Sequence, residues 1–324
     1  MKTRSMKLLF AVSCFAVACS VAIAADNYPS QPVKLIVGYA PGGTPDVIAR
    51  VIGQRLSAAM GQQFIVDNKP GAGGLVSTQT VAKSKPDGYT LLVADIGQLA
   101  ISPFIFKEPG FDLIKDFAPI SLVAVTPLFI AVNPGLKIAS FNDLVAYAKA
   151  NPGKLSYGSA GIGSIHHISM ESLKAELGLD IAHVPYKGSG QSVPGFMAGD
   201  VQVLAGAYPA LRPAIDSKKA TLLAVTSLKR FSHQPKVPAV SETLKGYDFP
   251  SEVGFLAPAG TPPDIIKRLS TEINKILKEP ETLARLEGLG SEAAGTTPEA
   301  YSANLKANLR KFQNAVKVSG AKAE

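Results

Sequence analysis

Short apolar runs alternate with longer amphipathic segments along almost the whole chain, and this alternation constrains the fold more than any other feature of the sequence. Apolar runs such as 34–37, 90–93 and 181–184 have the length and composition of buried strands, whereas the segments 47–60 and 265–277 carry apolar residues at helical spacing. Strands that alternate with helices predict an α/β protein with mostly parallel sheets flanked by helices.

Chain length adds a second constraint. A chain of 324 residues exceeds the size at which one hydrophobic core is comfortable, so two lobes are expected. The segments 124–127 and 228–237 indicate where the chain crosses between them. We therefore expect lobe 1 to comprise 25–124 with 232–324 and lobe 2 to comprise 125–231, with a hinge that lets the lobes close on a ligand.

Several helix starts are marked by a threonine that precedes a proline. Thr44, Thr261 and Thr297 have this neighbour, and the pair predicts a capping hydroxyl followed by the first helical residue. Thr261 immediately precedes the helical stretch 262–319, and Thr297 lies within it. This stretch has no sheet of its own, so we expect it to pack on the sheet of lobe 1.

The first 24 residues have the pattern of a secretory signal. A basic start, an apolar stretch over 8–18 and a small-x-small sequence at 22–24 predict cleavage after Ala24 and export. An alternative interpretation anchors a lipoprotein at Cys19. Because Cys14 and Cys19 both precede Ala24, the exported chain would fold without disulfides. No later apolar run reaches the roughly 20 residues needed to span a bilayer.

The charge of the exported chain is mild and evenly spread. Without the three basic residues of the signal, 30 basic residues face 25 acidic ones, which gives a net charge near +5. The chain has no basic run and no basic stripe interleaved with aromatic residues, so it does not look like a nucleic-acid-binding protein. A modest positive field favours anionic small molecules.

Small and polar residues follow the predicted strands. Glycines let a backbone approach a ligand closely, and N–H groups at a helix start attract anions, so these loops could hold a carboxylate without arginine. Aromatic and lysine side chains nearby could stack on the ligand or balance its charge. The candidate ligand-binding residues are Tyr39, Pro41, Gly42, Gly43, Thr44, Asp46, Asp95, Gln98, Ser159, Gly161, Ser164, His166, His167, Lys187, Ser189 and Tyr208.

Asp46 is expected to differ from the other candidates. A carboxylate in the first turn of a helix already uses the helix field, so Asp46 should point away from the ligand or hold the loop by hydrogen bonds.

The motifs of cofactor and nucleophile chemistry are missing. The chain has no GxGxxG after a strand and no GxxxxGK[ST], and its YGSAG segment lacks the first glycine of a GxSxG elbow. We therefore predict no cofactor and no catalytic residues. Two alternatives stay open. One is an exported enzyme with His166 as base. The other is a metal-binding receptor centred on His166, His167 and Glu171, although the pair His167 and Glu171 has no evident third ligand. His183 lies in an apolar run and is expected to be a core or sheet residue.

Eight segments in order resemble the Bug family, the periplasmic substrate-binding receptors of tripartite tricarboxylate transporters. The resemblance covers 28–319, including the spacing between segments. The segments are VGYAPGGTPDVIAR, DNKPGAGG, PDGYTLLV, KDFAPISLVA, YAKANPGKLSYGSAG, HVPYKGSG, LLAVTSLKR and FLAPAGTP.

The resemblance implies a monomeric two-lobed periplasmic-binding-protein (Venus-flytrap) fold that binds small organic acids without catalysis. Such receptors hold tricarboxylates, dicarboxylates, acidic amino acids or aromatic acids through backbone N–H groups, hydroxyls and water. The closed form is delivered to integral-membrane transporter subunits, or a sensor kinase takes their place.

Carried over by position, 41–46 and 95–98 match the family's ligand loops of lobe 1, and 159–167 and 186–189 match those of lobe 2. His167 and Glu171 stand where the family usually has His and Glu, so His167 is expected to be architectural and the variable His166 to affect selectivity. The chain departs from the family at 205–209, where AGAYP replaces Phe-Asp-Asn-Leu-Pro. This loss of polar groups favours a bulkier or purely anionic acid, such as an aromatic acid, over an amino acid.

Overall fold

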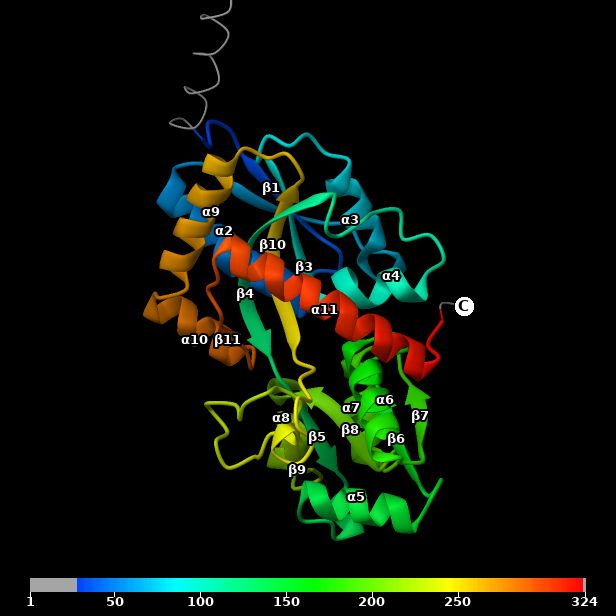
Figure 1. The fold of residues 1–324 in the computed structure, drawn as a ribbon. Helices are drawn as coiled ribbons and strands as arrows, with labels where there is room; N and C mark the ends of the chain where they lie inside the picture. Colours follow the sequence, from blue (N-terminus) through cyan, green and yellow to red (C-terminus); the bar gives the residue numbers. More distant parts are fainter. Residues whose placement is uncertain (1–27, 323–324) are drawn as a thin grey trace, which may run out of the picture.

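The computed structural model describes residues 28–322, which form two α/β lobes, one above the other in Figure 1. The predicted signal, its cleavage site at Ala24 and the alternative anchor at Cys19 lie outside the described residues. Lobe 1 is built on a six-stranded sheet and lobe 2 on a five-stranded sheet. The two-lobed α/β fold predicted from the sequence is therefore confirmed. No helix within 28–322 is long and apolar enough to cross a membrane.

The elements of lobe 1 come from both ends of the described chain. They are β1 (Val33–Val37), α2 (Thr44–Met60), β2 (Phe64–Asn68), η1 (Ala72–Gly74), α3 (Leu75–Ala82), β3 (Thr90–Asp95), η2 (Gly97–Ile101), α4 (Ser102–Ile105), β4 (Phe117–Thr126), β10 (Ser251–Pro258), α9 (Pro263–Ile276), α10 (Pro280–Gly288), β11 (Glu292–Ala293) and α11 (Pro298–Ser319).

The elements of lobe 2 come from the middle of the chain. They are β5 (Leu128–Val132), η3 (Pro134–Leu136), α5 (Phe141–Ala150), β6 (Leu155–Ser159), α6 (Ile165–Leu177), β7 (Ile181–Pro185), α7 (Ser189–Ala198), β8 (Val203–Ala207), α8 (Tyr208–Asp216), β9 (Thr221–Val225) and η4 (Val240–Glu242).

Both sheets are mixed rather than mostly parallel. The strand order is β11-β4-β10-β3-β1-β2 in lobe 1 and β7-β6-β8-β5-β9 in lobe 2. Strands β10 and β5 run antiparallel to both of their neighbours. The chain enters each sheet from the other lobe through these two strands, so they start where their neighbours end. As a result, the carboxyl ends of β1 and β3 point towards lobe 2, and those of β6, β7 and β8 point towards lobe 1 (Figure 1).

Two chain crossings join the lobes and are tied to each other by Thr226. Only Pro127 separates β4 from β5. The Thr226 hydroxyl accepts a hydrogen bond from the N–H of Leu128 at 3.1 Å and donates one to the carbonyl of Phe249 at 3.0 Å. The second crossing therefore passes close to Phe249, just before β10.

The predicted second crossing, 228–237, packs with lobe 2. Phe231 belongs to the core around β5 and β8, and Ala239 forms a parallel bridge with Val225 of β9. The division of the chain into 25–124 with 232–324 and 125–231 stays a prediction.

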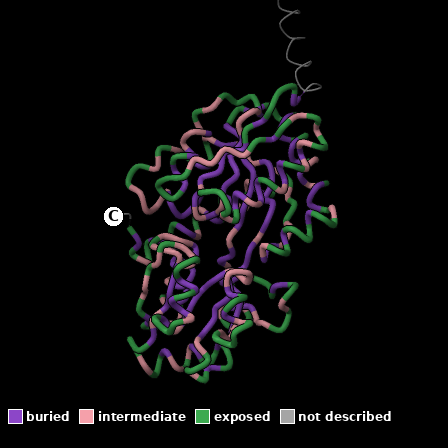
Figure 2. Tube along the Cα trace, turned by 180° about the vertical axis from the view of Figure 1, so that it is seen from behind, coloured by how far each residue is buried: buried purple, intermediate pink, exposed green. Residues whose placement is uncertain are grey.

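Helix α11 contacts both lobes. It packs on β4 and η2 in lobe 1 and on α6 in lobe 2, and Figure 1 shows it crossing the face of the upper sheet and reaching the lower lobe. Its Phe312 ring meets Phe249 edge-on, with the ring centroids 5.6 Å apart. The expected packing of the C-terminal helices on the first sheet is confirmed, and one core runs from that sheet into α6. Figure 2 shows buried strands inside each lobe and exposed segments around them.

One of the three predicted threonine caps is confirmed. The Thr297 hydroxyl accepts a hydrogen bond from the N–H of Ala300 at the start of α11. The other two predictions are wrong. Thr44 is the first residue of α2 and Gly43 occupies the cap, whereas α9 starts one residue later than expected, behind Pro262. The Thr261 hydroxyl instead donates to the carbonyl of Pro258.

Candidate functional site

The loops predicted to hold a ligand lie at the facing ends of the two sheets (Figure 1). They follow β1 and β3 in lobe 1 and β6 and β7 in lobe 2. The lobes touch here, because a Cβ added at Gly163, after β6, would overlap Cδ1 of Ile105 at the end of α4. Candidate residues from distant parts of the chain are thus carried by loops that oppose each other.

Asp46 holds the loop after β1. Its buried carboxylate accepts hydrogen bonds from the N–H of Gly42 at 2.9 Å, from Nε of Arg50 at 3.0 Å and from Nδ2 of Asn68 at 2.8 Å. Asn68 also donates to the carbonyl of Tyr39. Burial raises the pKa of Asp46, but these donors outweigh it, and the net effect is a lowered pKa. The contacts agree with the loop-holding role expected for Asp46.

The neighbouring loop residues are more open. Pro41, Gly42 and Thr44 are exposed, and Gly43 is partly exposed. Gly42 has a φ of 89°, a conformation that glycine adopts without strain. The N–H of Gly42 is already used by Asp46.

Tyr39 and Asp95 form a pair at the ends of β1 and β3. The Tyr39 hydroxyl donates to Oδ1 of Asp95 at 2.7 Å, and the same oxygen accepts the N–H of Gln98 at 2.9 Å. Burial raises the pKa of the Asp95 carboxyl. Burial, reinforced by Asp95, raises the pKa of Tyr39 well above its ordinary value. The phenol therefore stays protonated, with its proton directed at Asp95.

Gln98 lies behind this pair, and its side chain is fully buried. Its amide nitrogen donates to the hydroxyls of Ser77 at 2.9 Å and Thr78 at 2.6 Å. A Cβ added at Gly38 or Gly74 would overlap the Gln98 side chain. The structure thus places Gln98 between the end of β1 and the start of α3, so its contacts position loops rather than face the opposite lobe.

In lobe 2, the loop after β6 is organised around Ser159 and Ser164. The Ser159 hydroxyl is 2.7 Å from Nε2 of His183 and accepts the N–H of Gly161 at 3.1 Å. The Ser164 hydroxyl donates to the carbonyl of Gly161 at 2.7 Å and caps α6 by accepting the N–H of His167. Ser159, Gly161, Ser164 and His167 are therefore brought together as one hydrogen-bonded loop.

His167 and His183 form a stack beneath this loop. Their ring centroids are 4.1 Å apart, and His183 stacks in turn on Tyr157 at 4.8 Å. Nδ1 of His167 accepts the N–H of Gly163 at 3.1 Å, so the proton of the neutral ring is on Nε2. Burial lowers the pKa of His167 and lowers that of His183 to about 4. These contacts agree with an architectural role for both rings, which stays a prediction.

His166 is the neighbouring ring, and its Nδ1 is buried without a hydrogen-bond partner within the described residues. Burial lowers the pKa of His166 to about 4, so the imidazole is neutral near pH 7. A neutral imidazole can donate one hydrogen bond to a carboxylate but brings no charge.

The side chains of the remaining candidates make no hydrogen bond to these clusters within the described residues, although the N–H groups of Tyr186 and Gly188 donate to the carbonyls of Ser159 and Ala160. Lys187 is exposed and makes no ion pair within 28–322. Ser189 begins α7 and is partly exposed. Tyr208 begins α8 and packs on the Phe129 ring at 5.5 Å. The contacts of Tyr208 are those of a packing residue.

Two contributors were missed from the sequence. Asn68 joins Asp46 to the loop of Tyr39, and its DNKPGAGG segment was noted without a role for this side chain. Ile105 meets Gly163 across the lobes, and no sequence pattern pointed to it. Both depend on contacts between residues far apart in the chain.

The geometry does not favour a metal centre at His166, His167 and Glu171. No group of three His, Cys, Asp or Glu side chains within 28–322 could hold a metal ion. Glu171 instead accepts hydrogen bonds from the Tyr157 hydroxyl at 2.6 Å and from Lys174 at 2.7 Å.

Comparisons with known proteins identify one family of relatives. The family described as "Tripartite tricarboxylate transporter family receptor" matches residues 48–319. Protein BugT of Bordetella pertussis is 33% identical over 322 residues, which are 98% of each chain.

Two solved structures of relatives contain a ligand. Rpa4515 of R. palustris, solved with adipate, is 32% identical, has a TM-score of 0.79 and is matched over 91% of this chain and 99% of its own. MatC of Rhodopseudomonas palustris, solved with bound malate, is 25% identical, has a TM-score of 0.74 and is matched over 89% of this chain and 100% of its own.

Proposed function

Because the chain belongs to the family of tripartite tricarboxylate transporter receptors, we propose that it is a periplasmic receptor that binds a small organic acid between its two lobes and delivers it to a transporter of this type. The ligand is a dicarboxylate, a tricarboxylate or an aromatic carboxylate. The adipate and malate in the relatives' structures support the dicarboxylate class most directly.

One observation carries the proposal: loops of both lobes lie at the facing ends of the two sheets, and each loop is held in place by residues behind it. Loops 41–44 and 159–164 are fixed from behind by Asp46 and by the Ser159–His183 pair, which leaves their outer edges to meet a ligand. Loops held in place before binding lose little conformational freedom when the ligand arrives. A ligand that contacts both loops stabilises the closed arrangement because it binds that arrangement better than the open one.

The enzyme alternative has less support. A general base needs a partner that orients it, and Nδ1 of His166 makes no hydrogen bond within the described residues. The receptor therefore remains the better account of this site.

Titration of the exported chain with adipate, malate, citrate, benzoate, nicotinate and glutamate, by calorimetry and thermal unfolding, tests the proposal. At least one of the acids other than glutamate should bind saturably, raise the unfolding temperature and reduce the radius of gyration of the protein in solution scattering. Mass spectrometry of the same mixtures should recover the acid unchanged. A tight-binding acid that leaves the radius unaltered, or that is converted to a product, would contradict the receptor function.

A further inference from the structure

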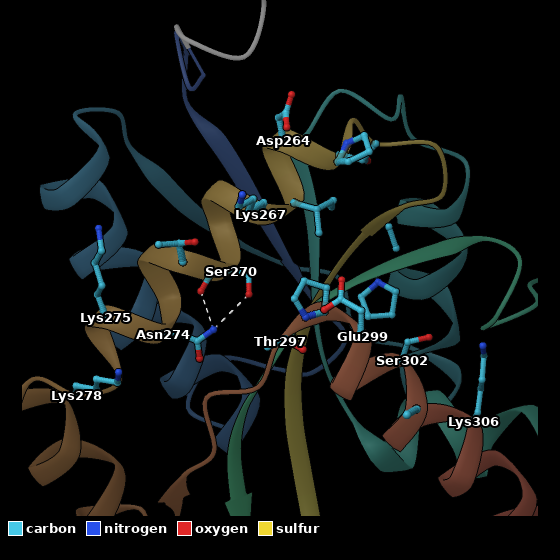
Figure 3. A pocket seen from close by; sticks show the side chains of 18 residues that line it. Asp264, Lys267, Ser270, Asn274, Lys275, Lys278, Thr297, Glu299, Ser302 and Lys306 are labelled. Carbon is cyan, nitrogen blue, oxygen red and sulfur yellow. Dashed lines mark hydrogen bonds between the residues drawn. The ribbon is translucent and has the colours of Figure 1, made fainter.

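An open groove of about 1140 Å³ lies on lobe 1 between α9 and α11, and it shares no residue with the ligand loops (Figure 3). One wall includes Lys267 and Asn274 of α9 and Lys278 just after this helix, and the α11 wall includes Ser302 and Lys306. Short side chains line much of the space between these walls. The groove is therefore a surface that the proposed ligand binding does not use.

The rim of the groove is positively charged on both walls. Lys275 lies on α9 and Lys278 just beyond its end, and Lys306 extends from α11 on the opposite side in Figure 3. Lys275 pairs with Glu272. Lys267, Lys278 and Lys306 are exposed and make no ion pair within residues 28–322. The lysines outnumber the acidic lining residues, Asp264 and Glu299, so the groove attracts negative charge.

The floor of the groove is apolar and small. It includes Ala118 and Pro119 of β4, Ile266 of α9 and Ala303 of α11. An apolar floor between positively charged walls suits a partner that has one apolar face and acidic flanks. A small anion would leave this apolar floor exposed to water.

The floor of the groove also favours a helix over a strand as the bound element of the partner. Strand β11 pairs with β4 at Val125 and Ala124, and residues 294–296 continue along this edge as far as Leu122 and Ser121, so only residues 117–120 at the start of β4 keep an open edge. Pro119 lies on that stretch and has no N–H, which disfavours the addition of a strand. A helix satisfies its own backbone and needs only side-chain contacts.

The spacing of the lysines on α9 indicates how long a bound helix would be. Lys267 and Lys275 lie eight residues apart on α9, which is about 12 Å along the helix axis. A partner helix of roughly three turns covers that distance.

We propose that the groove between α9 and α11 docks an acidic amphipathic helix of a protein partner. This goes beyond the proposed function, and it rests on that function only in that a delivering receptor needs a partner. The lysines of both walls contact acidic side chains on the flanks of the helix, while the apolar face of the helix covers Pro119 and Ala303.

The test uses the full exported chain and a labelled synthetic peptide. The peptide is a helix of about fourteen residues, with a Leu and Ala stripe flanked by Glu, and its binding is followed by fluorescence anisotropy. Wild-type protein should bind it saturably, and added salt should weaken the binding because surface charges are screened. The triple variant K267E/K278E/K306E should weaken binding at least about tenfold.

A matched variant controls for net charge. K154E/K236E/K245E reverses three exposed lysines outside the groove, and it should bind the peptide like wild type apart from a small uniform loss. Ala303→Arg, which fills the floor, should also abolish binding while adding positive charge. Circular dichroism and acid binding, measured on every variant, show that each is folded.

Several results would overturn the inference. These are no saturable binding of the peptide to wild type, equal losses in the groove and control variants, and equal binding of a peptide with Lys in place of Glu. Self-association of wild type that only the groove variant loses would assign the surface to a second copy, and vesicles of anionic lipid bound in place of the peptide would assign it to a membrane. The titration is independent of acid binding, so failure of the proposed function would be seen separately.

Discussion

The hydroxyl of Tyr39 donates a hydrogen bond to Oδ1 of Asp95 over 2.7 Å, and this bond joins the loop after β1 to the end of β3. Both residues are partly buried, so the carboxylate depends largely on its few protein donors. The pair fixes the spacing of two strands whose ends face lobe 2. Its removal should therefore affect both stability and ligand binding.

Tyr39→Phe deletes the donor and leaves the buried carboxylate with one donor fewer. We expect a loss of about 1–2 kcal/mol in the free energy of unfolding, measured with urea, and weaker acid binding. Tyr208→Phe is the control, because the Tyr208 hydroxyl makes no hydrogen bond within the described residues. Equal losses in the two variants would show that the Asp95 contact has no special role.

Asp46→Asn tests the loop-holding carboxylate through its pH dependence. The pKa of Asp46 is lowered in the folded protein, so its stabilisation is present above the unfolded pKa and is lost as pH falls through the folded pKa. The stability difference between wild type and Asp46→Asn should therefore be largest near pH 7 and shrink towards pH 3. Asp264→Asn, an exposed acidic residue in the first turn of α9, should show little difference at either pH.

Gly163→Ala tests the contact between the lobes. The new methyl would overlap Ile105, and the φ of 77° at Gly163 strains any other residue. The control is Gly178→Ala, where φ is 65° but no atom lies within 4 Å of the added Cβ, so only backbone strain of about 1 kcal/mol is expected. Acid affinity should fall for Gly163→Ala alone. Unchanged affinity would mean that the loops do not close against α4.

The buried histidines predict a loss of stability in mild acid. Burial lowers the pKa of His183 to about 4. The unfolded chain, in which this pKa is about 6.5, therefore binds a proton at His183 more readily than the folded protein does. Stability should be full above that pH and should fall as pH drops from 6.5 towards 4. His183→Gln should flatten the decline measured by urea unfolding, whereas His233→Gln, which changes an exposed ring, should not. A decline of the same slope in His183→Gln would reject this assignment.

Thr226→Val removes the hydroxyl that joins both chain crossings. It leaves the N–H of Leu128 and the carbonyl of Phe249 without that partner, and a loss of about 1–3 kcal/mol in unfolding free energy is expected. Ser227→Ala, at an exposed neighbouring hydroxyl that bonds only Lys229, should cost much less. A similar loss in both variants would show that the crossings are held by other contacts.

The fold was accessible from the sequence because its signals are local. Apolar runs and helical periods lie within single elements, so β1, α2 and β3 could be predicted near their observed bounds. The reversed direction of β5 and β10 could not be predicted in this way, since it follows from how the chain passes between lobes. Thr44 shows the same limit, because it was expected to cap the helix but is the first residue of α2, and Asp46 holds the loop before it.

The site was accessible in outline and not in detail. Glycine-rich loops at strand ends led to the facing segments, but sequence spacing did not reveal that Gln98 is buried between Gly38 and Gly74. Nor did it reveal that Asn68 braces the loop of Tyr39. These roles depend on the packing of α3 and β2 against β1, which brings together residues that are distant in sequence.

The single residue between β4 and β5 has a mechanical consequence. A link as short as Pro127, fastened through Thr226 to the other connection, cannot lengthen, so the two halves cannot slide apart along their long axis. Relative movement of the lobes is then a rotation about this link, and it must also shift α6 against α11. Points far from the pivot then travel furthest for a given angle, so a small rotation at Thr226 becomes a large displacement at the outermost loops.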